Sequence, residues 1–443
     1  MRTKTIFQGI FWVIVYLLLT LSPLLILLIS PRPQGREFWR EFSIALGFTS
    51  LAMMALQFVL TARFKWLKAP YGSDIVYHFH RQISLIAFIL IISHKAILLI
   101  FSPDTFQLFN LFTAPWRSRA AVTALILLII MIVISLWRKR LKIDYTHWRI
   151  WHGILATVVI ILGMIHVVLV GHYINTPFKQ VLWSSGGLFW VLTLAWVRII
   201  KPIILLRHPY EVVQVIPERG NTYTLEVKPV GHQGMKFLPG QFAWITVWNS
   251  PFSDTEHPFS ISSSAEGYGC LSFTIKEFGT FTQGIKTLQP GQRVWVDGPY
   301  GAFSLDRHTH AKGFAFIAGG VGITPMMSML RTLADRRDQR PLLLIYANKD
   351  RENIIFREEI ERLKKHLNLQ VIHVVENPPE NWHGEKGYIN QEILERALPK
   401  PLQRNDWEIF ICGPEPMMNS VESCLPKLGI WWGDFHSERF NLV

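Results

Sequence analysis

Six long apolar segments fill the first half of this 443-residue chain, and they constrain its fold more than any other feature. A helix needs about 20 apolar residues to cross the ~30 Å hydrocarbon core of a bilayer. Segments of this length occupy residues 6–29, 41–61, 76–101, 120–137, 149–170 and 181–200. The sequence therefore predicts a bundle of six transmembrane helices, with both of its ends on one side of the membrane.

The balance of charged residues changes at the same place as the hydropathy, near residue 207. Residues 1–207 hold 21 Lys and Arg against five Asp and Glu, whereas the remainder holds 24 against 27, and the whole chain carries +13. With the termini inside, the flanks and loops of the inner side hold more of these basic residues than those of the outer side. This bias favours a cytoplasmic N-terminus and a cytoplasmic second half. Because the basic residues flank apolar runs, we expect contact with membrane lipid and no binding of nucleic acid.

Composition excludes several other classes of protein. Half of the residues are hydrophobic and 17% are charged, which excludes a disordered or fibrous chain. The three cysteines form no CxxC pair, so neither a disulfide framework nor a cysteine-ligated metal centre is expected. The first apolar run is longer than the core of a signal peptide, and we expect it to remain as a span.

Four histidines lie inside two of the predicted spans, where ionisable residues are costly and usually functional. His80 and His94 are 14 residues apart in the third span, and His152 and His166 are 14 residues apart in the fifth. At ~100° and ~1.5 Å per residue, this spacing places each pair on one helix face, ~21 Å apart in height. Both spans run in the same direction. The spacing therefore predicts that His80 lies level with His152, and His94 with His166.

Two such cross-helix pairs of imidazoles suit two b-type haems. Low-spin haem iron takes an imidazole on each side and passes single electrons. A zinc ion would need a third or fourth ligand at the same level, and none is visible in these spans. The alternative interpretation is that the four histidines are hydrogen-bonded to backbone or serine within the bundle.

The hydrophobic period shortens after Tyr210, where short alternating segments separated by Gly and Pro predict an antiparallel β-barrel. After Lys312 strands alternate with helical segments, which predicts a parallel sheet. The expected fold is multi-domain: a six-helix transmembrane bundle over residues 1–207, an antiparallel β-barrel over 208–308, and an α/β parallel-sheet domain over 309–443.

A glycine-rich turn, Gly319-Gly-Val-Gly-Ile-Thr-Pro325, follows the first strand of the predicted parallel sheet. Such a turn lets backbone N–H groups and a helix N-terminus approach a pyrophosphate. Lys349 and Arg351 follow the second strand, where the ribose of a bound dinucleotide lies in this topology. Two cations there favour a 2′-phosphate and therefore NADPH, while Asp350 between them leaves NADH as the alternative.

Further motifs follow in a fixed order through the second half: His257-Pro-Phe-Ser-Ile-Ser-Ser263, Gly279-Thr-Phe-Thr282, Gly298-Pro-Tyr-Gly301, the glycine-rich turn, Cys412-Gly-Pro414 and Ser437-Glu-Arg-Phe440. This order resembles the ferredoxin-reductase-type flavoprotein module. Preceded by six spans with paired histidines, it makes the whole chain similar to the ferric reductase and NADPH oxidase superfamily, especially its compact bacterial members.

The resemblance implies a role for each motif. The residues that would face the flavin of FAD are His257, Pro258, Phe259 and Ser260. Those that would cradle its phosphates are Ser262, Ser263, Gly279, Thr280 and Thr282. Those that would hold the nicotinamide dinucleotide are Gly320, Gly322, Thr324 and Pro325. Cys412 and Gly413 would border the nicotinamide ring. The residues assigned to catalysis are Ser260, near the nitrogen that accepts hydride, Cys412, and Phe440, which would stack on the flavin until nicotinamide displaces it.

The resemblance implies an integral protein of a bacterial inner membrane. Its implied function is transfer of electrons from NAD(P)H, through FAD and two b-type haems, to an acceptor on the opposite side of that membrane. That acceptor would be oxygen, reduced to superoxide, or ferric iron. One alternative is an electron-donating membrane module that serves a periplasmic or membrane protein partner. Another is a haem-free transporter or sensor fused to a reductase. Short outer loops favour a small diffusible acceptor.

Overall fold

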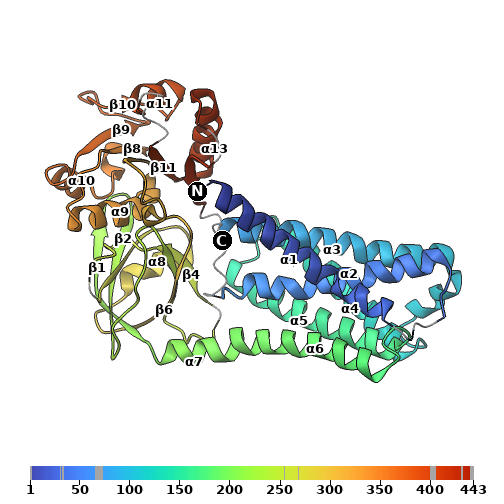
Figure 1. Ribbon diagram of the computed structural model, residues 1–443. Helices are drawn as coiled ribbons and strands as arrows, with labels where there is room; N and C mark the ends of the chain where they lie inside the picture. Colours follow the sequence, from blue (N-terminus) through green and yellow to red (C-terminus); the bar gives the residue numbers. More distant parts are fainter. Residues whose placement is uncertain are drawn as a thin grey trace. The chain divides into compact units, whose positions relative to one another are not determined.

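Six long helices form the first half of the chain in the computed structural model (Figure 1), which describes residues 2–29, 31, 34–64, 73–253, 255–267, 269–399, 406–430 and 433–439. These helices are α1 (Arg2–Leu28), α2 (Phe38–Thr61), α3 (Ser73–Phe101), α4 (Trp116–Trp137), α5 (Tyr145–Val170) and α6 (Pro177–Ala195). All six are long and apolar enough to cross a membrane, in agreement with the predicted segments.

Several helices begin a few residues before the predicted apolar segments, because a polar first turn belongs to the helix but not to the hydrophobic pattern. At the start of α5, the Asp144 carboxylate accepts hydrogen bonds from the backbone N–H groups of Thr146 and His147. The helix ends at Gly171, whose φ of 64° suits a residue without a side chain. The last helix, α6, continues through a π-helical turn (Trp196–Ile200) into α7 (Lys201–Leu206).

Aromatic and branched side chains form the core of the bundle. The Phe48 ring lies 5.4 Å from the Trp183 ring, edge to face, and joins α2 to α6. Gly163 lets α5 approach α2, since a Cβ there would lie 2.9 Å from Leu51 Cδ1. Leu18 and Ile100 are 65% and 68% exposed in the protein alone. Large apolar side chains facing outward on long helices are typical of a surface covered by lipid.

The first sheet of the second half is antiparallel and six-stranded. Its strands are β1 (Tyr210–Glu218), β2 (Thr222–Pro229), β3 (Phe242–Val247), β4 (His257–Ser260), β5 (Leu271–Lys276) and β6 (Arg293–Tyr300), in the order β4-β3-β6-β1-β2-β5. The antiparallel prediction is confirmed, and closure into a barrel stays a prediction. The two edges meet after β4, where Ile261 forms a bridge with Phe273 and the N–H of Ser262 donates to the Ser272 carbonyl at 2.7 Å. The edge strand β4 is short and contains Pro258, which has no backbone N–H to donate to a further ladder.

The second sheet is parallel and also has six strands. They are β7 (Gly313–Gly319), β8 (Leu342–Asn348), β9 (Leu369–Val375), β10 (Glu385–Lys386), β11 (Trp407–Cys412) and β12 (Phe435–Ser437), in the order β10-β9-β8-β7-β11-β12. The pairing confirms the predicted parallel α/β sheet. The edge strands β10 and β12 were not predicted, because two or three residues carry no readable period.

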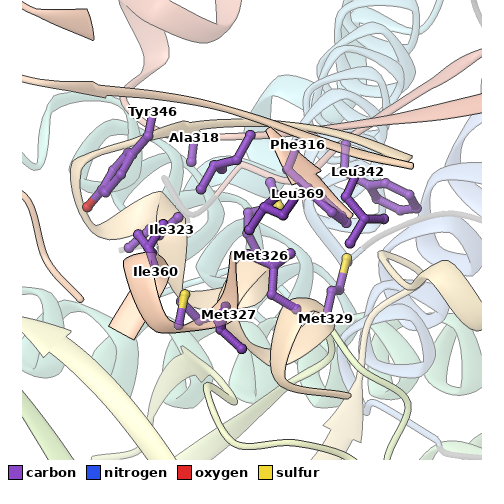
Figure 2. Close-up of a cluster of buried hydrophobic side chains, with 14 of the residues drawn as sticks. Phe316, Ala318, Ile323, Met326, Met327, Met329, Leu342, Tyr346, Ile360 and Leu369 are labelled. Carbon is purple, nitrogen blue, oxygen red and sulfur yellow. The ribbon is translucent and has the colours of Figure 1, made fainter. Parts of the chain in front are cut away.

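Helices cover both faces of the parallel sheet. On one face, α9 (Ile323–Asp335) packs Met326 and Met329 against Phe316 and Leu342 of the strands, as Figure 2 shows. On the other face lie α11 (Gln391–Ala397) and α13 (Glu415–Cys424). The contacts divide the chain into two units, one of Met1–Pro70 with Ile75–Lys201 and the other of Tyr71–Asp74 with Pro202–Val443, so both sheets belong to the second unit.

Candidate functional site

The first pair of membrane histidines joins α3 to α5. The ring centroids of His80 and His152 lie 6.4 Å apart, with an angle of 72° between the ring planes. Two metal–nitrogen bonds of about 2 Å each, together with roughly one ring radius on either side, come to about 6 Å. The separation of the two rings therefore matches that of two imidazoles on opposite sides of one metal ion.

Hydrogen bonds orient both rings of this pair. Nδ1 of His80 lies 2.7 Å from Oε1 of Gln57, an atom that only accepts. Nδ1 of His152 lies 3.3 Å from the Ser135 hydroxyl. That hydroxyl donates its one proton to the carbonyl of Met131 at 2.7 Å, so it accepts from His152. Both rings therefore carry their proton on Nδ1, which leaves the Nε2 lone pair for a metal.

The rings of His94 and His166 are also oriented by hydrogen bonds from Nδ1. Nδ1 of His94 lies 2.8 Å from the backbone carbonyl oxygen of Ser43, and Nδ1 of His166 lies 2.8 Å from that of Arg117. Because a carbonyl only accepts, Nδ1 donates in both rings and Nε2 again keeps its lone pair. Gly47 permits this packing, since a Cβ there would lie 3.2 Å from Nδ1 of His94.

The donor set at each level therefore consists of two neutral imidazoles from α3 and α5. Among the described residues, three or more metal-binding side chains gather only in a different place, within the second unit. Two imidazoles with free Nε2 atoms fit the axial positions of haem iron and fall short of the four ligands of a structural zinc site.

In the second unit, the strand β4 and the loop after β5 bring aromatic rings together. The His257 ring stacks on Phe281, with the centroids 4.0 Å apart and the planes 24° apart. Phe259 lies parallel to the same ring at 5.9 Å. Pro258 and Ser260 are buried, and Ser260 is 7% exposed. The strand thus alternates between buried side chains and side chains that stack beside the loop.

The hydroxyl groups predicted to cradle phosphates have partners within the protein. Ser262 is fully buried and its hydroxyl accepts a hydrogen bond from Thr274 at 3.0 Å. The Ser263 hydroxyl accepts from the backbone N–H of Ser272 at 3.2 Å. The structure therefore gives these two serines hydrogen bonds that hold the end of β4 against β5.

The loop after β5 carries the other residues predicted to cradle phosphates. Gly279 has a φ of 94° and precedes a short helix, α8 (Thr280–Gly284). The Thr282 hydroxyl accepts from the N–H of Phe278 at 2.6 Å and donates to the Gly279 carbonyl at 3.1 Å, which closes the turn. Thr280 is exposed at the start of this helix.

The glycine-rich turn after β7 meets the Cys-Gly-Pro segment after β11, because these strands are neighbours and run in parallel. A Cβ on Gly322 would lie 2.3 Å from the carbonyl oxygen of Cys412, and one on Gly413 would lie 2.9 Å from the backbone nitrogen of Gly319. Gly320 has a φ of 53°, and its carbonyl accepts a hydrogen bond from Tyr346 at 3.0 Å. Only glycine allows the two turns to pack this closely.

Helix α9 fastens the parallel sheet to the antiparallel one. The Ser328 hydroxyl donates to the carbonyl of Ser263 at 2.8 Å, and the Arg331 guanidinium donates to the carbonyl of Ser262 at 2.6 Å. Near the start of the helix, the buried Thr324 hydroxyl donates to the Val321 carbonyl at 2.8 Å, and Pro325 is also buried. The helix that begins at the glycine-rich turn is therefore bonded directly to the end of β4.

Cys412 is buried at the carboxyl end of β11. Burial raises the pKa of its thiol well above the usual range, and the nearby charge of Glu438 adds to this. The sulfur is therefore a neutral thiol at physiological pH. The predicted partner in the same region, Phe440, lies outside the described residues.

Lys349 and Arg351 flank Asp350 at the carboxyl end of β8. The Asp350 carboxylate accepts hydrogen bonds from the side-chain amides of Asn353 at 3.0 Å and Asn377 at 3.2 Å. Lys349 is exposed, and the buried Nε of Arg351 has no hydrogen-bond partner within the described ranges. The acidic residue is thus held by neutral amides beside two cations.

Three family models match successive parts of the chain. A ferric reductase like transmembrane component matches residues 46–164, an FAD-binding domain matches 207–304, and an oxidoreductase NAD-binding domain matches 316–423. The chain has the domain architecture of the ferric reductase and NADPH oxidase superfamily. The six helices able to span a membrane and the FAD-binding and NAD-binding domains agree with the predicted order of domains.

Relatives of this ferric reductase-like chain include NADH-cytochrome b5 reductase 2 of Neurospora crassa, which is 35% identical over 161 residues, or 36% of this chain and 46% of that protein. The protein of the same name from Phaeosphaeria nodorum is 32% identical over 193 residues, or 42% of this chain and 56% of that protein. The chain spans about half the length of these curated relatives. They are fungal, so they lend no support to the expected bacterial origin.

Solved structures with a similar course of the chain include the cytochrome b5 reductase domain of Ulva prolifera nitrate reductase. It has a TM-score of 0.46 and 23% identity, over 52% of this chain and 96% of that one. Another is the flavohemoglobin from Malassezia yamatoensis, with a TM-score of 0.49 and 15% identity, over 92% of this chain and 100% of that one.

Sequence reasoning did not identify the groups that orient the histidines of this ferric reductase-like chain. Gln57 and Ser135 are polar residues inside apolar spans, and this pattern could have marked them as partners. The carbonyl groups of Ser43 and Arg117 give no sequence signal, because every residue has one. Arg331 was also missed, since a cation in an amphipathic helix is usually solvated.

Proposed function

We propose that this ferric reductase-like chain transfers electrons from NAD(P)H across the membrane to a small acceptor, either oxygen or ferric iron, with FAD and two b-type haems as its cofactors. Bound FAD divides the two electrons of a hydride into single electrons, and haem iron with two imidazole ligands carries one electron at a time. The observation that supports the proposal is the hydrogen-bonded Nδ1 of all four imidazoles, together with the 6.4 Å separation of the His80 and His152 rings.

In the membrane, the role of the protein is to hold these rings and to exclude water. His80 and His152 would ligate one haem, and His94 and His166 the other. Hydrogen bonds from Nδ1 prevent each ring from rotating and keep its Nε2 directed at the metal. The excess of Lys and Arg on one side of the spans supports a cytoplasmic N-terminus and cytoplasmic FAD and NAD(P)H domains, with the acceptor on the opposite side.

At the dinucleotide domains, backbone shape would do most of the binding. Gly320 and Gly322 would let the turn approach the pyrophosphate, and Thr324 and Pro325 would begin the helix that faces it. Cys412 and Gly413 would border the nicotinamide ring, where a neutral thiol adds no charge that opposes hydride transfer.

On the flavin side, His257, Pro258, Phe259 and Ser260 would line the ring, and Phe440 would cover it. The exposed loop of Gly279, Thr280 and Thr282 would contact the phosphates of FAD. The hydroxyls of Ser262 and Ser263 have protein partners, so we assign these two residues backbone contacts to the phosphates rather than side-chain contacts.

The choice of NADPH over NADH rests on the end of β8. Lys349 and Arg351 would bind a 2′-phosphate, while the Asp350 carboxylate between them accepts hydrogen bonds from two asparagines. The identity of the acceptor rests on the outer loops. The connection between α5 and α6 spans only residues 171–176, which favours a small acceptor over a docked protein.

The decisive experiment is NADPH oxidation by the full chain in detergent. We expect a Soret band that changes on addition of NADPH. We also expect NADPH consumption with either superoxide dismutase-sensitive reduction of a reporter dye in air or reduction of a ferric chelate under nitrogen. A preparation with FAD but no Soret band would reduce the proposal to a membrane-bound flavoprotein. Activity only after addition of a membrane or periplasmic extract would reject the small acceptor.

A further inference from the structure

Three histidines and one glutamate gather on the side of the parallel sheet where β12 is the edge strand. His308 and His310 belong to the connector between the two sheets, after a short 3₁₀ turn (Leu305–Arg307) and before β7. Glu408 is the second residue of β11, and His436 lies on the neighbouring strand β12. We call these four residues the connector cluster. They are separate from the membrane histidines, and they lie near the start of β11, whereas Cys412 is at its end.

The ligand atoms of His308, Glu408 and His436 all lie within 4.8 Å of one another, and His310 approaches them through Glu408. Oε1 of Glu408 lies 3.3 Å from Nδ1 of His308 and 3.0 Å from Nε2 of His310. Its other oxygen lies 2.7 Å from Nε2 of His436. With zinc–ligand bonds of about 2.0–2.1 Å, neighbouring ligands in a tetrahedron are about 3.3 Å apart. The glutamate–histidine separations of 2.7–3.3 Å lie at or just below this value, and the half-exposed His310 side chain would have to move toward the other two histidines to complete the tetrahedron.

Burial shows that the cluster is incompletely satisfied by the protein alone. His308 is 6% exposed and its Nδ1 has no hydrogen-bond partner in the described part of the chain, although the atom lies beside the carboxylate. The centroids of the His308 and His436 rings are 4.0 Å apart, so two imidazoles face one carboxylate in a buried space. A buried ring nitrogen without a partner is unfavourable, and a bound cation would satisfy it.

We propose that the connector cluster binds one zinc ion. Three imidazole nitrogens and one carboxylate oxygen suit zinc, whereas calcium and magnesium require oxygen ligands. Four protein ligands leave no open position, so the ion has a structural role and does not bind substrate. It ties the connector between the FAD-binding and NAD-binding domains to β11 and β12. It also holds the segment after β12, where the N–H of Glu438 donates to the Ile411 carbonyl at 3.2 Å.

The test is metal binding by the full chain in detergent after treatment with a chelator, which leaves haem iron in place. Zinc added back should bind at one ion per chain and raise the melting temperature, and cobalt should give the visible absorption of a tetrahedral site. His310→Ala is the first variant, because this ring is about half exposed and its loss should not prevent folding. Glu408→Gln is the second, and the exposed His366→Ala is the matched control.

Both cluster variants should lower zinc affinity by more than about 100-fold, since outer-shell partners alone change it by about 10- to 100-fold. His366→Ala should bind zinc as the wild type does. Absence of stoichiometric zinc in the wild type would overturn the proposal. Equal zinc binding by wild type and His310→Ala would overturn it as well. Because the readouts are stoichiometry, absorption and melting temperature, they do not depend on the proposed electron transfer.

Discussion

The two halves of this molecule position their functional groups by different means. In the membrane half, hydrogen bonds orient the side chains that we propose as ligands, as when the Ser43 carbonyl holds His94 at 2.8 Å. In the second half, close backbone packing shapes the turns that we propose to bind the dinucleotide, as at Gly322 beside the Cys412 carbonyl. The comparison teaches why the first half shows only spaced histidines, whereas the second half shows contiguous motifs.

The largest effect should follow from removing one membrane ligand. His94→Ala should abolish delivery of electrons to the far side of the membrane, with the loss of one haem. Reduction of FAD by NADPH should continue, because it takes place in the other half. Stopped-flow flavin absorbance and the Soret band measure the two events separately. The control is His78→Ala, an exposed histidine on the same helix. If flavin reduction failed as well, the separation of the halves would be wrong.

In the second half, Gly322→Ala should have a comparably large effect, on binding of the dinucleotide. The new Cβ would lie 2.3 Å from a backbone oxygen, which cannot move aside as a side chain could. Overpacking of this kind costs about 3 kcal/mol at the upper end, so we expect the KM for NADPH to rise by at least tenfold, with the haem spectrum unchanged. A Cβ at Gly320 would meet no atom within 4 Å. Gly320→Ala should therefore cost only about 1–2 kcal/mol of conformational free energy, because the residue has a left-handed backbone conformation. Equal effects in steady-state kinetics would contradict the packing argument.

A smaller effect sharpens the account of the membrane half. Gln57→Leu removes the acceptor for Nδ1 of His80, and loss of such a partner costs about 10- to 100-fold in metal affinity. Gln57→Glu keeps an acceptor and should retain the haem while lowering its midpoint potential. Haem content and redox titration measure both variants. Full haem retention and an unchanged potential in Gln57→Leu would show that this hydrogen bond does not control the ligand.

The smallest expected effect concerns the choice of dinucleotide. Changing both Lys349 and Arg351 to Ala should raise the KM for NADPH by about tenfold or more, since a hydrogen bond to a charged group contributes about 1.5–3 kcal/mol. The KM for NADH should stay nearly constant, which makes NADH the control. Equal loss with both dinucleotides would mean that these cations bind the shared part of the cofactor and do not read the 2′-phosphate.

Much of the fold was predictable, because long apolar runs and alternating strands are local patterns. The six helices and the parallel sheet with its glycine-rich turn were predicted close to their observed bounds. Closure of the antiparallel sheet into a barrel depends on tertiary contact between its edges, which meet only at the Ile261–Phe273 bridge and the hydrogen bond from Ser262 to Ser272 among the described residues. The short strand β12 was not predicted, because it is formed only by pairing with β11, which is distant in the sequence. The same pairing brings His436 beside Glu408.

The sequence by itself determined the level of one histidine pair: a spacing of 14 residues on two parallel helices places His80 level with His152, and their rings lie 6.4 Å apart. Only the tertiary structure decided which nitrogen of each ring is free, because the partners of Nδ1 are groups on other helices. The tertiary structure also assembled the connector cluster, whose members lie more than 100 residues apart between His308 and His436. Helical periodicity acts along one segment and can be read from it, whereas hydrogen bonds and ligand clusters depend on which segments pack together.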